Sequence, residues 1–316
     1  MILIVTSRSD YTADYLVLRL NELQIPYVRF NTEDFPFDAF SSLGSSQESI
    51  YLKKAARRVD LREIESVWYR RPEGPAFPTD FDYEARDFVN HECREFLLGM
   101  WRSLTCLWVN EPDKIRLSEN KIEQLRRMKQ MSMRVPETVI TNDPSVVKDF
   151  RKNHREVIAK TLRQSHGTLG DREYVIYTNA VLDDHLELLE TIRYSPVIFQ
   201  EKVEKASDIR VTVVGSELFA TEIHSQENSA TSLDWRRDTL SLKHTVHHLP
   251  DEIEKQCLNL VNSYGLVFGA LDLVRTPSSE YVFLELNPNG QWAWIEALTH
   301  QPIGDKLIEV LTNGSI

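Results

Sequence analysis

The first third of the chain alternates short apolar runs with one stretch of helical periodicity. Ile2 to Thr6 is an apolar run, Thr12 to Leu23 repeats leucines every three to four residues, and Tyr27 to Asn31 is a second run. This pattern predicts a strand, a helix and a strand, which is typical of a right-handed βαβ unit in a parallel sheet. A strand at 66–72 and a helix at 83–104 are predicted to continue this layer.

The remaining two thirds are richer in strands. The charged segment from Asp113 to Met131 predicts one helix, and Asn142-Asp143-Pro144 predicts the entry to another. A polar segment at 163–172 is predicted to be a loop. Further strands are predicted at 157–161, 173–181, 197–203, 209–214, 217–225, 270–274 and 281–287, followed by helices near 292–298 and 304–311.

Two carboxylates and an amide stand in the two apolar strands of the C-terminal hairpin. Asp272 lies in the first strand, and Glu285 and Asn287 lie in the second. Carboxylate and amide oxygens suit Mg²⁺, which shares its remaining positions with water and nucleotide phosphates. The alternative is an alternating strand whose acidic residues face solvent. We favour the metal, because facing carboxylates repel each other without a cation.

The register of this hairpin decides whether the acidic groups meet. If residues 277–280 form the loop, Thr276 pairs with Tyr281 and Asp272 falls opposite Glu285. Directly opposed side chains have Cβ atoms about 4.5–5.5 Å apart. The period of two along a strand places Asn287 on the face of Glu285. A slip of one residue would separate them.

A lysine and nearby glycines are candidates for phosphate binding. The sequence has neither GxxxxGK[ST] nor GxGxxG, so a P-loop or a typical dinucleotide fingerprint is not supported. Instead Lys160 ends an apolar strand just before a stretch with Gly167 and Gly170. A lysine there can reach phosphate oxygens, and glycines let backbone N–H groups approach them. Lys160 could equally be a plain surface residue.

The segment from Val197 to Arg210 adds groups suited to a nucleotide. Backbone groups at the end of an apolar strand, here near Gln200 and Glu201, can bind an adenine edge, and a following acidic side chain can bind ribose hydroxyls. Arg210 opens an alternating strand and could stabilise charge during phosphoryl transfer. It could instead form a salt bridge with Asp208 or another neighbour. Arg236, in a loop, offers a second cation.

Composition narrows the setting. A chain of 316 residues with 41% hydrophobic content can form two or three packed domains. The net charge of −11 argues against non-specific nucleic-acid binding, although a nucleotide could occupy a local basic pocket. We expect no membrane span and, because the N-terminus predicts a strand rather than a signal peptide, a cytoplasmic protein. The three cysteines, Cys93, Cys106 and Cys257, predict buried free thiols.

Taken in order, these motifs resemble the ATP-grasp superfamily over about residues 113–290. The resemblance is carried by Asn120-Lys121, Ala159-Lys160, Gln200-Glu201-Lys202-Val203, Asp208-Ile209-Arg210, Asp272 and Glu285-Leu286-Asn287. It implies an α/β (α+β) ATP-grasp fold with a pre-ATP-grasp βαβ domain at 1–112, a central lid domain at 113–203 and a C-terminal domain at 204–316 that clamp ATP between them.

The same resemblance implies roles for individual residues. Lys121 and Lys160 would bind ATP phosphates, Glu201 and Val203 would hold adenine, and Arg210 would face an acyl-phosphate. Gln200, Asp208 and Gly167 would complete the ATP site. The ligands of Mg²⁺ would be Asp272, Glu285 and Asn287.

Two further stretches resemble the graspetide (microviridin-type) peptide macrocyclases. They are Phe283 to Trp292 and the N-terminal motifs Tyr11 to Asp14, Arg29 to Pro36 and Trp68-Tyr69-Arg70-Arg71-Pro72. Such enzymes bind a ribosomally made precursor peptide by its leader and join side-chain carboxylates of an acidic core to Ser/Thr hydroxyls or Lys amines. The resemblance implies a leader site around Pro136 to Thr141 and a homodimer.

Several alternatives stay open at this level. Arg70 and Arg71, with Arg236, could attract acidic substrate side chains, or the first two could form a salt-bridge cluster at a strand end. The general base is not identified, and His166 and His224 are candidates. Rival functions are a ligase that adds amino acids to a protein tail or joins small amino acids, and a catalytically silent peptide- or nucleotide-binding module.

Overall fold

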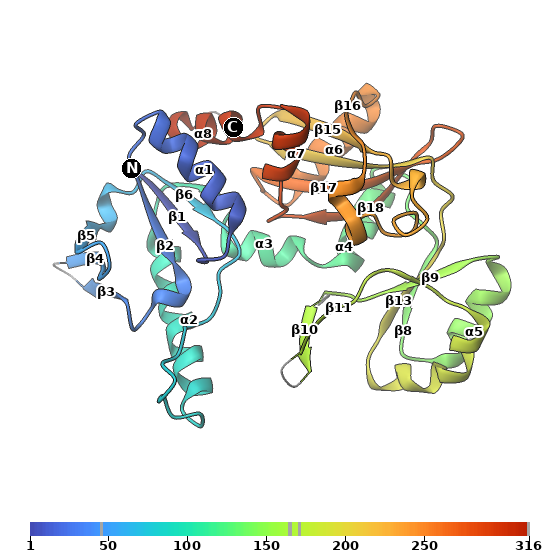
Figure 1. Ribbon diagram of the computed structural model, residues 1–316, viewed down its shortest axis with the longest axis horizontal. Coiled ribbons are helices and arrows are strands. Elements are labelled where there is room, and N and C mark those ends of the chain that lie inside the picture. The colour runs from blue at the N-terminus through green and yellow to red at the C-terminus, as the bar shows by residue number, and fades with distance from the viewer. Residues whose placement is uncertain (45–46, 164–165, 170–171, 315–316) are drawn as a thin grey trace.

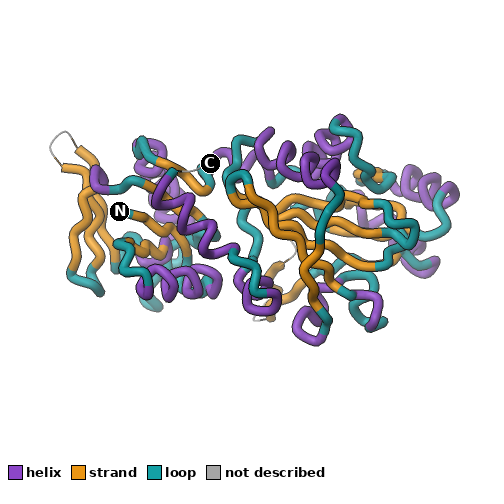
Figure 2. Tube along the Cα trace, turned by 90° about the horizontal axis from the view of Figure 1, so that it is seen from above, coloured by secondary structure: helices purple, strands orange, loops and turns teal. Residues whose placement is uncertain are grey.

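The computed structural model describes residues 1–44, 47–163, 166–169 and 172–314 of the chain. Within these ranges the strands form five sheets, against which the helices pack (Figure 1). Figure 2 shows the N-terminal strands at one end of the long axis and the large C-terminal sheet at the other, with helices between them. The described part contains no helix both long enough and apolar enough to cross a lipid bilayer.

The predicted βαβ unit is confirmed. Helix α1 (Tyr11–Glu22) begins at Asp10, whose side chain accepts a hydrogen bond from the Ala13 N–H and so caps the helix. The four strands are parallel and lie in the order β2 (Tyr27–Asn31), β1 (Ile2–Thr6), β6 (Ser66–Tyr69) and β7 (Leu107–Val109). The carboxyl ends of β1 and β6 therefore meet at one edge, where Asp10 and Arg70 follow them.

A small antiparallel sheet extends this part of the chain, and the sequence patterns did not indicate it. It consists of β3 (Ala39–Gly44), β4 (Gln47–Leu52) and β5 (Arg57–Asp60). Only Ala39, Ile50 and Val59 among its apolar side chains are fully buried, so its alternation is weak. Helix α2 (Arg86–Ser103) covers the parallel sheet and begins three residues later than predicted.

The charged segment after residue 112 is two helices, and the prediction of one helix was wrong. α3 (Pro112–Ser118) ends before Asn120, and α4 (Lys121–Gln130) begins after it. The Asn120 carboxamide oxygen accepts from the N–H groups of Ile122 and Glu123, so it caps α4. This cap places Lys121 at the first position of a helix, rather than in the middle of one.

The central part of the chain forms a four-stranded antiparallel sheet with helix α5 (Pro144–Asn153). In spatial order its strands are β12 (Asn179–Ala180), β9 (Val157–Lys160), β13 (Val197–Glu201) and β8 (Thr138–Thr141). A separate hairpin of β10 (His166–Leu169) and β11 (Arg172–Val175) extends away from this sheet (Figure 1). The strand predicted at 173–181 is thus divided between two sheets. A 3₁₀ segment, Asp183–Tyr194, follows.

The C-terminal part is a five-stranded antiparallel sheet. Its order is β16 (His244–His247), β15 (Glu217–Ile223), β14 (Ser207–Val214), β17 (Phe268–Arg275) and β18 (Tyr281–Asn287). Three helices complete it, namely α6 (Asp251–Ser263), α7 (Ala293–Thr299) and α8 (Ile303–Asn313). Strands β14 and β17 are almost wholly buried, although β14 alternates polar residues such as Asp208, Arg210 and Thr212 with apolar ones.

The register of the last hairpin is partly as predicted. Asp272 lies opposite Glu285, which confirms the expected pairing, but Tyr281 pairs with Arg275 and not with Thr276. The turn is one residue longer, since the Thr276 N–H donates to the Glu280 carbonyl at 2.9 Å. A bulge at Leu284 restores the register before Glu285 is reached.

One hydrophobic core joins the N-terminal and C-terminal parts. Leu16 of α1, Trp68 of β6, Trp292 and Leu307 of α8 are all buried in it. The Trp292 ring packs near both Trp68 and Tyr15. The segment that follows Glu285 and Asn287 of β18 is consequently held against the first sheet.

Candidate active site

A row of charged side chains crosses three neighbouring strands of the C-terminal sheet. Arg210 of β14 pairs with Asp272 of β17, which pairs with Glu285 of β18. Arg210 Nη1 donates to both Asp272 oxygens, at 2.9 and 3.0 Å. The Asn287 amide lies 3.4 Å from Asp272 Oδ2 and 3.5 Å from Glu285 Oε1. The salt bridge left open as an alternative for Arg210 therefore occurs, with the neighbour Asp272 and not with Asp208.

Two lysines approach the same carboxylates from the central part of the chain. Lys121 Nζ lies 3.1 Å from Glu285 Oε2 and donates to the Thr161 carbonyl at 3.3 Å. Gln124, one turn further along α4, bonds both main-chain groups of Leu286 and so fixes α4 against β18. Lys160 ends β9, and burial, together with the nearby cations Lys121 and Arg236, lowers its pKa to about 8.

The two carboxylates differ electrostatically. Burial raises the pKa of Asp272, and Glu285 acts in the same direction against the guanidinium of Arg210. Burial also acts to raise the pKa of Glu285, but the cations Lys121, Lys160 and Arg236 outweigh it and hold that pKa at about 2. The Glu285 carboxylate is therefore firmly ionised. Asp272 is buried beside it, and an additional cation would relieve the repulsion between the two groups.

This donor set fits Mg²⁺. The residues that the structure describes contain no group of three His, Cys, Asp or Glu side chains placed to hold a metal ion. Two carboxylates with one amide oxygen suit a cation that takes its other ligands from water and phosphate.

Two cavities meet at this row. The smaller, of about 290 Å³, contains Lys121 and Lys160 and is called the lysine cavity here. The larger, of about 1010 Å³, is called the arginine cleft. Its arginines come from the segment after β6, from α2 and α3, from the segment after β9 and from the C-terminal part, namely Arg71, Arg94, Arg102, Arg116, Arg163, Arg210 and Arg236. Asp272, Glu285 and Asn287 line both cavities.

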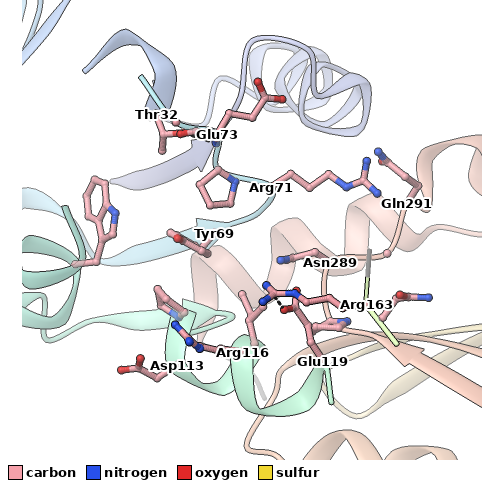
Figure 3. A pocket seen from close by; sticks show the side chains of 18 of the residues that line it. Thr32, Tyr69, Arg71, Glu73, Asp113, Arg116, Glu119, Arg163, Asn289 and Gln291 are labelled. Carbon is pink, nitrogen blue, oxygen red and sulfur yellow. Dashed lines mark hydrogen bonds and ion pairs between the residues drawn. The ribbon is translucent and has the colours of Figure 1, made fainter. Parts of the chain in front are cut away.

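Three arginines of the cleft are unpaired. Within the described residues, no hydrogen bond or ion pair holds the side chains of Arg71, Arg94 or Arg116, whereas Arg163 pairs with Glu119 at 2.9 Å. Figure 3 shows Arg71 reaching toward Gln291 and Arg116 lying below Tyr69. The cleft is thus a wide basic space directly beside buried carboxylates.

Comparisons with known proteins decide the family. Residues 118–311 match the RimK-like ATP-grasp domain, and residues 1–116 match the MvdD pre-ATP grasp domain.

This chain belongs to the RimK-like ATP-grasp family.

It is therefore an ATP-grasp ligase, as the resemblance implied. The macrocyclase MdnC of Microcystis aeruginosa MRC, solved bound with precursor peptide MdnA, has a TM-score of 0.90 and 31% identity over 99% of this chain and 100% of that one. A Chryseobacterium gregarium RiPP-associated ATP-grasp ligase, solved with ADP and a leader and core peptide, has a TM-score of 0.91 and 30% identity over 100% and 97%. The glutamate–LysW ligase ArgX of Sulfurisphaera tokodaii is 23% identical, over 64% of this chain and 72% of its own length.

Among the other predicted nucleotide residues of this ATP-grasp ligase, Asp208 lines the lysine cavity, whereas Gln200, Glu201 and Val203 line neither cavity. Gln200 is buried and donates to Thr138 Oγ1 at 2.8 Å, and Glu201 accepts from the Glu137 N–H at 3.1 Å. The Val203 N–H has no partner among the described residues. An adenine role for Gln200, Glu201 and Val203 stays a prediction.

Asp208 lines the lysine cavity, but its oxygens are already engaged. They accept from Lys205 Nζ, at 2.8 and 3.0 Å, and from Ser225 Oγ. Burial raises the pKa of Asp208 above its ordinary value. Its nucleotide role stays a prediction.

The segment 163–172, which was predicted to be a loop, instead contains strand β10 and the first residue of β11, which pair as a hairpin. Gly167 pairs with Tyr174 in it, while Ser165 and Gly170 lie outside the described residues, as does the side chain of His166. The other candidate base, His224, lies at the end of β15 and contacts Thr245 Oγ1 at 3.1 Å; it lines neither cavity. The structure does not bring His224 to the site.

The predicted substrate arginines have different positions. Arg236 lines both cavities and is held by Asp234, with Nε to Oδ1 at 2.8 Å. Arg71 lines the arginine cleft. Arg70 is 1% exposed and forms a buried salt bridge with Asp10, so the expected direct substrate contact does not fit its position. The strand-end salt bridge, the open alternative, is what occurs.

The sequence patterns did not single out several residues of the cleft. Arg94 and Arg116 lie on charged helices where nothing separates them from ordinary surface residues. Trp235 and Trp294, whose rings are 5.4 Å apart, come from a loop and a helix distant in sequence. Among the sequence patterns, only the motifs Trp68 to Pro72 and Phe283 to Trp292 indicated residues that line the arginine cleft.

Proposed function

We propose that this chain activates Glu or Asp side chains of a ribosomally made precursor peptide as acyl-phosphates and joins them to Ser/Thr hydroxyls or Lys amines of the same peptide. The observation that carries this proposal is the meeting of the lysine cavity and the arginine cleft at Asp272 and Glu285. Two relatives whose solved structures contain a precursor or core peptide, at 31% and 30% identity, support it.

Asp272, Glu285 and Asn287 would hold Mg²⁺, which when bound neutralises phosphate charge. Lys121 and Lys160 lie on the lysine-cavity side of these ligands, so they are placed to bind ATP phosphates and to orient the γ-phosphoryl group. The free Val203 N–H is available to an adenine nitrogen at the end of β13.

Arg210 is the cation on the other side of the row. A substrate carboxylate entering from the arginine cleft attacks the γ-phosphorus, ADP leaves, and the carboxyl carbon now has a phosphate leaving group. A hydroxyl or amine then adds to that carbon and loses its proton, the bond from the carbon to the phosphate oxygen breaks, and inorganic phosphate leaves. Arg210 lines the cleft beside Asp272, so its guanidinium can stabilise the negative charge that develops on the acyl oxygens.

The unpaired arginines suit an acidic peptide. Arg71, Arg94 and Arg116 are exposed and have no partner in the described part of the chain, so a carboxylate does not have to displace an existing ion pair. In a protein of net charge −11, this local excess of positive charge would attract acidic side chains to the cleft.

Other features of the assembly are part of the same proposal. We assign the leader to the surface around Pro136 to Thr141 and α5, where β8 is an edge strand. An extended peptide can add to such an edge. We also propose that the chain consists of three domains, 1–112, 113–203 and 204–316. We propose that it forms a homodimer and acts in the cytoplasm.

A peptide from a neighbouring short reading frame, encoding Glu/Asp clusters with Ser/Thr or Lys, provides the test. The purified chain, Mg²⁺, ATP and this neighbouring-frame peptide should yield ADP and a peptide that has lost one water mass per bond formed. A ligase that adds amino acids to a tail, as the name of the ArgX relative describes, would instead increase the mass of its acceptor. Absence of ADP formation with every such peptide would favour the silent binding module and contradict our proposal.

A further inference from the structure

Arg70 lies outside both cavities, yet a continuous chain of hydrogen bonds leads from it to the charged row. Arg70 Nη2 donates to Gln291 Oε1 at 2.9 Å. The main-chain carbonyl of Gln291 accepts from Arg210 Nη2 at 3.3 Å, and Arg210 Nη1 donates to Asp272. The first sheet is thereby connected to the candidate catalytic arginine through one residue.

Arg70, at one end of this series of hydrogen bonds, is held rigidly. Arg70 and Asp10 are 1% and 2% exposed, and Arg70 Nε donates to Asp10 Oδ2 at 2.5 Å. Thr6 Oγ1 also donates to Asp10, and the Arg70 guanidinium lies 5.1 Å from the centre of the Trp68 ring. A buried guanidinium that is held at Nε and Nη2 by these partners has little freedom to rotate.

The Gln291 end is equally constrained. Gln291 Oε1 also accepts from Thr12 Oγ1, so α1 and β6 both fix this side chain. The preceding Gly290 passes so close to Arg210 that a Cβ atom there would lie 2.7 Å from Nη2 and 2.3 Å from the Ala270 Cβ. The segment therefore lies directly against the guanidinium, and its position determines where Nη2 can be.

Arg210 has few other restraints. Its Nε makes no hydrogen bond among the described residues, so its guanidinium is held by Asp272 at one nitrogen and by Gln291 at another. Without the Gln291 carbonyl, the group could rotate about its contact with Asp272. A misplaced cation stabilises the reacting acyl group poorly, because small displacements at a reaction centre are costly.

We propose that Arg70 is a positioning residue for ligation: it holds Gln291, whose carbonyl fixes the orientation of Arg210 toward the acyl group. This inference rests on the role proposed above for Arg210. The N-terminal part of the chain would then help to position Arg210 for bond formation, in addition to lining the arginine cleft.

The test uses the full chain with Mg²⁺, ATP and the neighbouring-frame peptide. Gln291→Met removes the acceptor at similar volume and leaves the Arg70–Asp10 pair intact, whereas Gln291→Glu retains an acceptor for Arg70. We expect Gln291→Met to lower the kcat for bond formation roughly tenfold to a hundredfold while the KM for ATP stays within about twofold. The number of ADP molecules released per bond formed should rise, because bond formation is slower and water hydrolyses more of the acyl-phosphate. Gln291→Glu should restore the wild-type ratio.

A double-mutant cycle separates positioning from a general structural effect. If Gln291 acts through Arg210, Gln291→Met should cause little further loss in an Arg210→Lys background. Arg19→Ala is the matched control, since the exposed Arg19–Asp305 ion pair also joins α1 to the C-terminal part but leads to no site residue. It should leave the ADP-to-bond ratio unchanged. Arg70→Lys, which keeps a charge beside Asp10 but cannot reach both partners, gives the same comparison if Gln291→Met does not fold.

Each outcome has a definite reading. Additive losses in the cycle, or an unchanged ADP-to-bond ratio in a folded Gln291→Met protein, would overturn the positioning role and leave the proposed function intact. If the wild-type chain forms no bonds at all, the proposed function fails first, and the positioning role fails with it.

Discussion

The lysine cavity and the arginine cleft share seven lining residues, among them Arg236, Asp272, Glu285 and Asn287, but differ in size and in how their cations are held. The lysine cavity is about 290 Å³, and its Lys121 is already paired with Glu285. The arginine cleft is about 1010 Å³, and Arg71, Arg94 and Arg116 in it have no partner among the described residues. A compact, preorganised cavity suits one ligand of fixed shape such as a triphosphate. A wide space with unpaired planar cations suits carboxylates that arrive on a variable peptide.

This difference implies that the two halves of the reaction can be impaired separately. Changes in the lysine cavity should affect ATP, and changes in the arginine cleft should affect the peptide. Changes at Asp272 and Glu285, which line both cavities, should affect both ATP and the peptide.

The largest effect is expected where the cavities meet. Asp272→Ala and Glu285→Ala should each lower both ADP formation and ligation on the order of a thousandfold, because the metal ligands and the charge balance of the row are lost together. Glu309→Ala is the control, since this carboxylate of α8 pairs with Lys306 and lines neither cavity. ATP-dependent ligation retained in both site variants would refute the metal assignment.

Arg210→Lys should separate the two half-reactions. We expect ligation to fall roughly a hundredfold, because an ammonium does not reproduce two directed N–H contacts to Asp272 and Gln291. The KM for ATP should change little, since Arg210 lines the cleft and not the lysine cavity. Near-normal turnover would remove Arg210 from the mechanism.

The lysine cavity should show its own pH dependence. The pKa of Lys160 is lowered by burial to about 8, below its ordinary value, so its charge is lost as the pH rises through about 8. Because kcat/KM for ATP reports the free enzyme, it should fall up to about tenfold per pH unit above this point. Lys160→Arg keeps its charge and should remove this alkaline limb. An identical limb in that variant would assign the titration to another group.

The smallest effect is expected from the exposed cleft. Arg71→Ala and Arg116→Ala should each raise the KM for the neighbouring-frame peptide about threefold and leave the KM for ATP unchanged. The difference from wild type should shrink at high salt, because exposed charges are screened. Arg62→Ala, an exposed arginine paired with Asp60 outside the cleft, is the matched control. An equal increase in the KM for ATP would contradict the proposal that ATP binds in the lysine cavity and the peptide in the arginine cleft.

The sequence predicted local features better than distant contacts. The predicted pairing of Asp272 with Glu285 is confirmed, but the loop assumed for it was one residue too short. The Thr276–Tyr281 pair was wrong because a longer turn and a bulge at Leu284 compensate each other, and neither has a clear local signature.

Errors elsewhere have similar physical causes. Asn120 divides the charged stretch into two helices because its side chain caps the second helix. The pattern of charged residues along the stretch does not show where such a cap interrupts it. Arg70 and Arg71 are adjacent, yet one faces the core and Asp10 while the other, with φ of 45°, enters the cleft. Residues such as Arg94 and Arg116 become part of a site only through tertiary folding.

The most direct test of the account follows an oxygen atom. The neighbouring-frame peptide should be labelled with ¹⁸O in its Glu and Asp side-chain carboxyls and treated with the wild-type chain, Mg²⁺ and ATP. If these carboxylates become acyl-phosphates, one labelled oxygen should appear in inorganic phosphate for each bond formed. Bond formation with unlabelled phosphate, or with release of pyrophosphate and AMP, would contradict the mechanism.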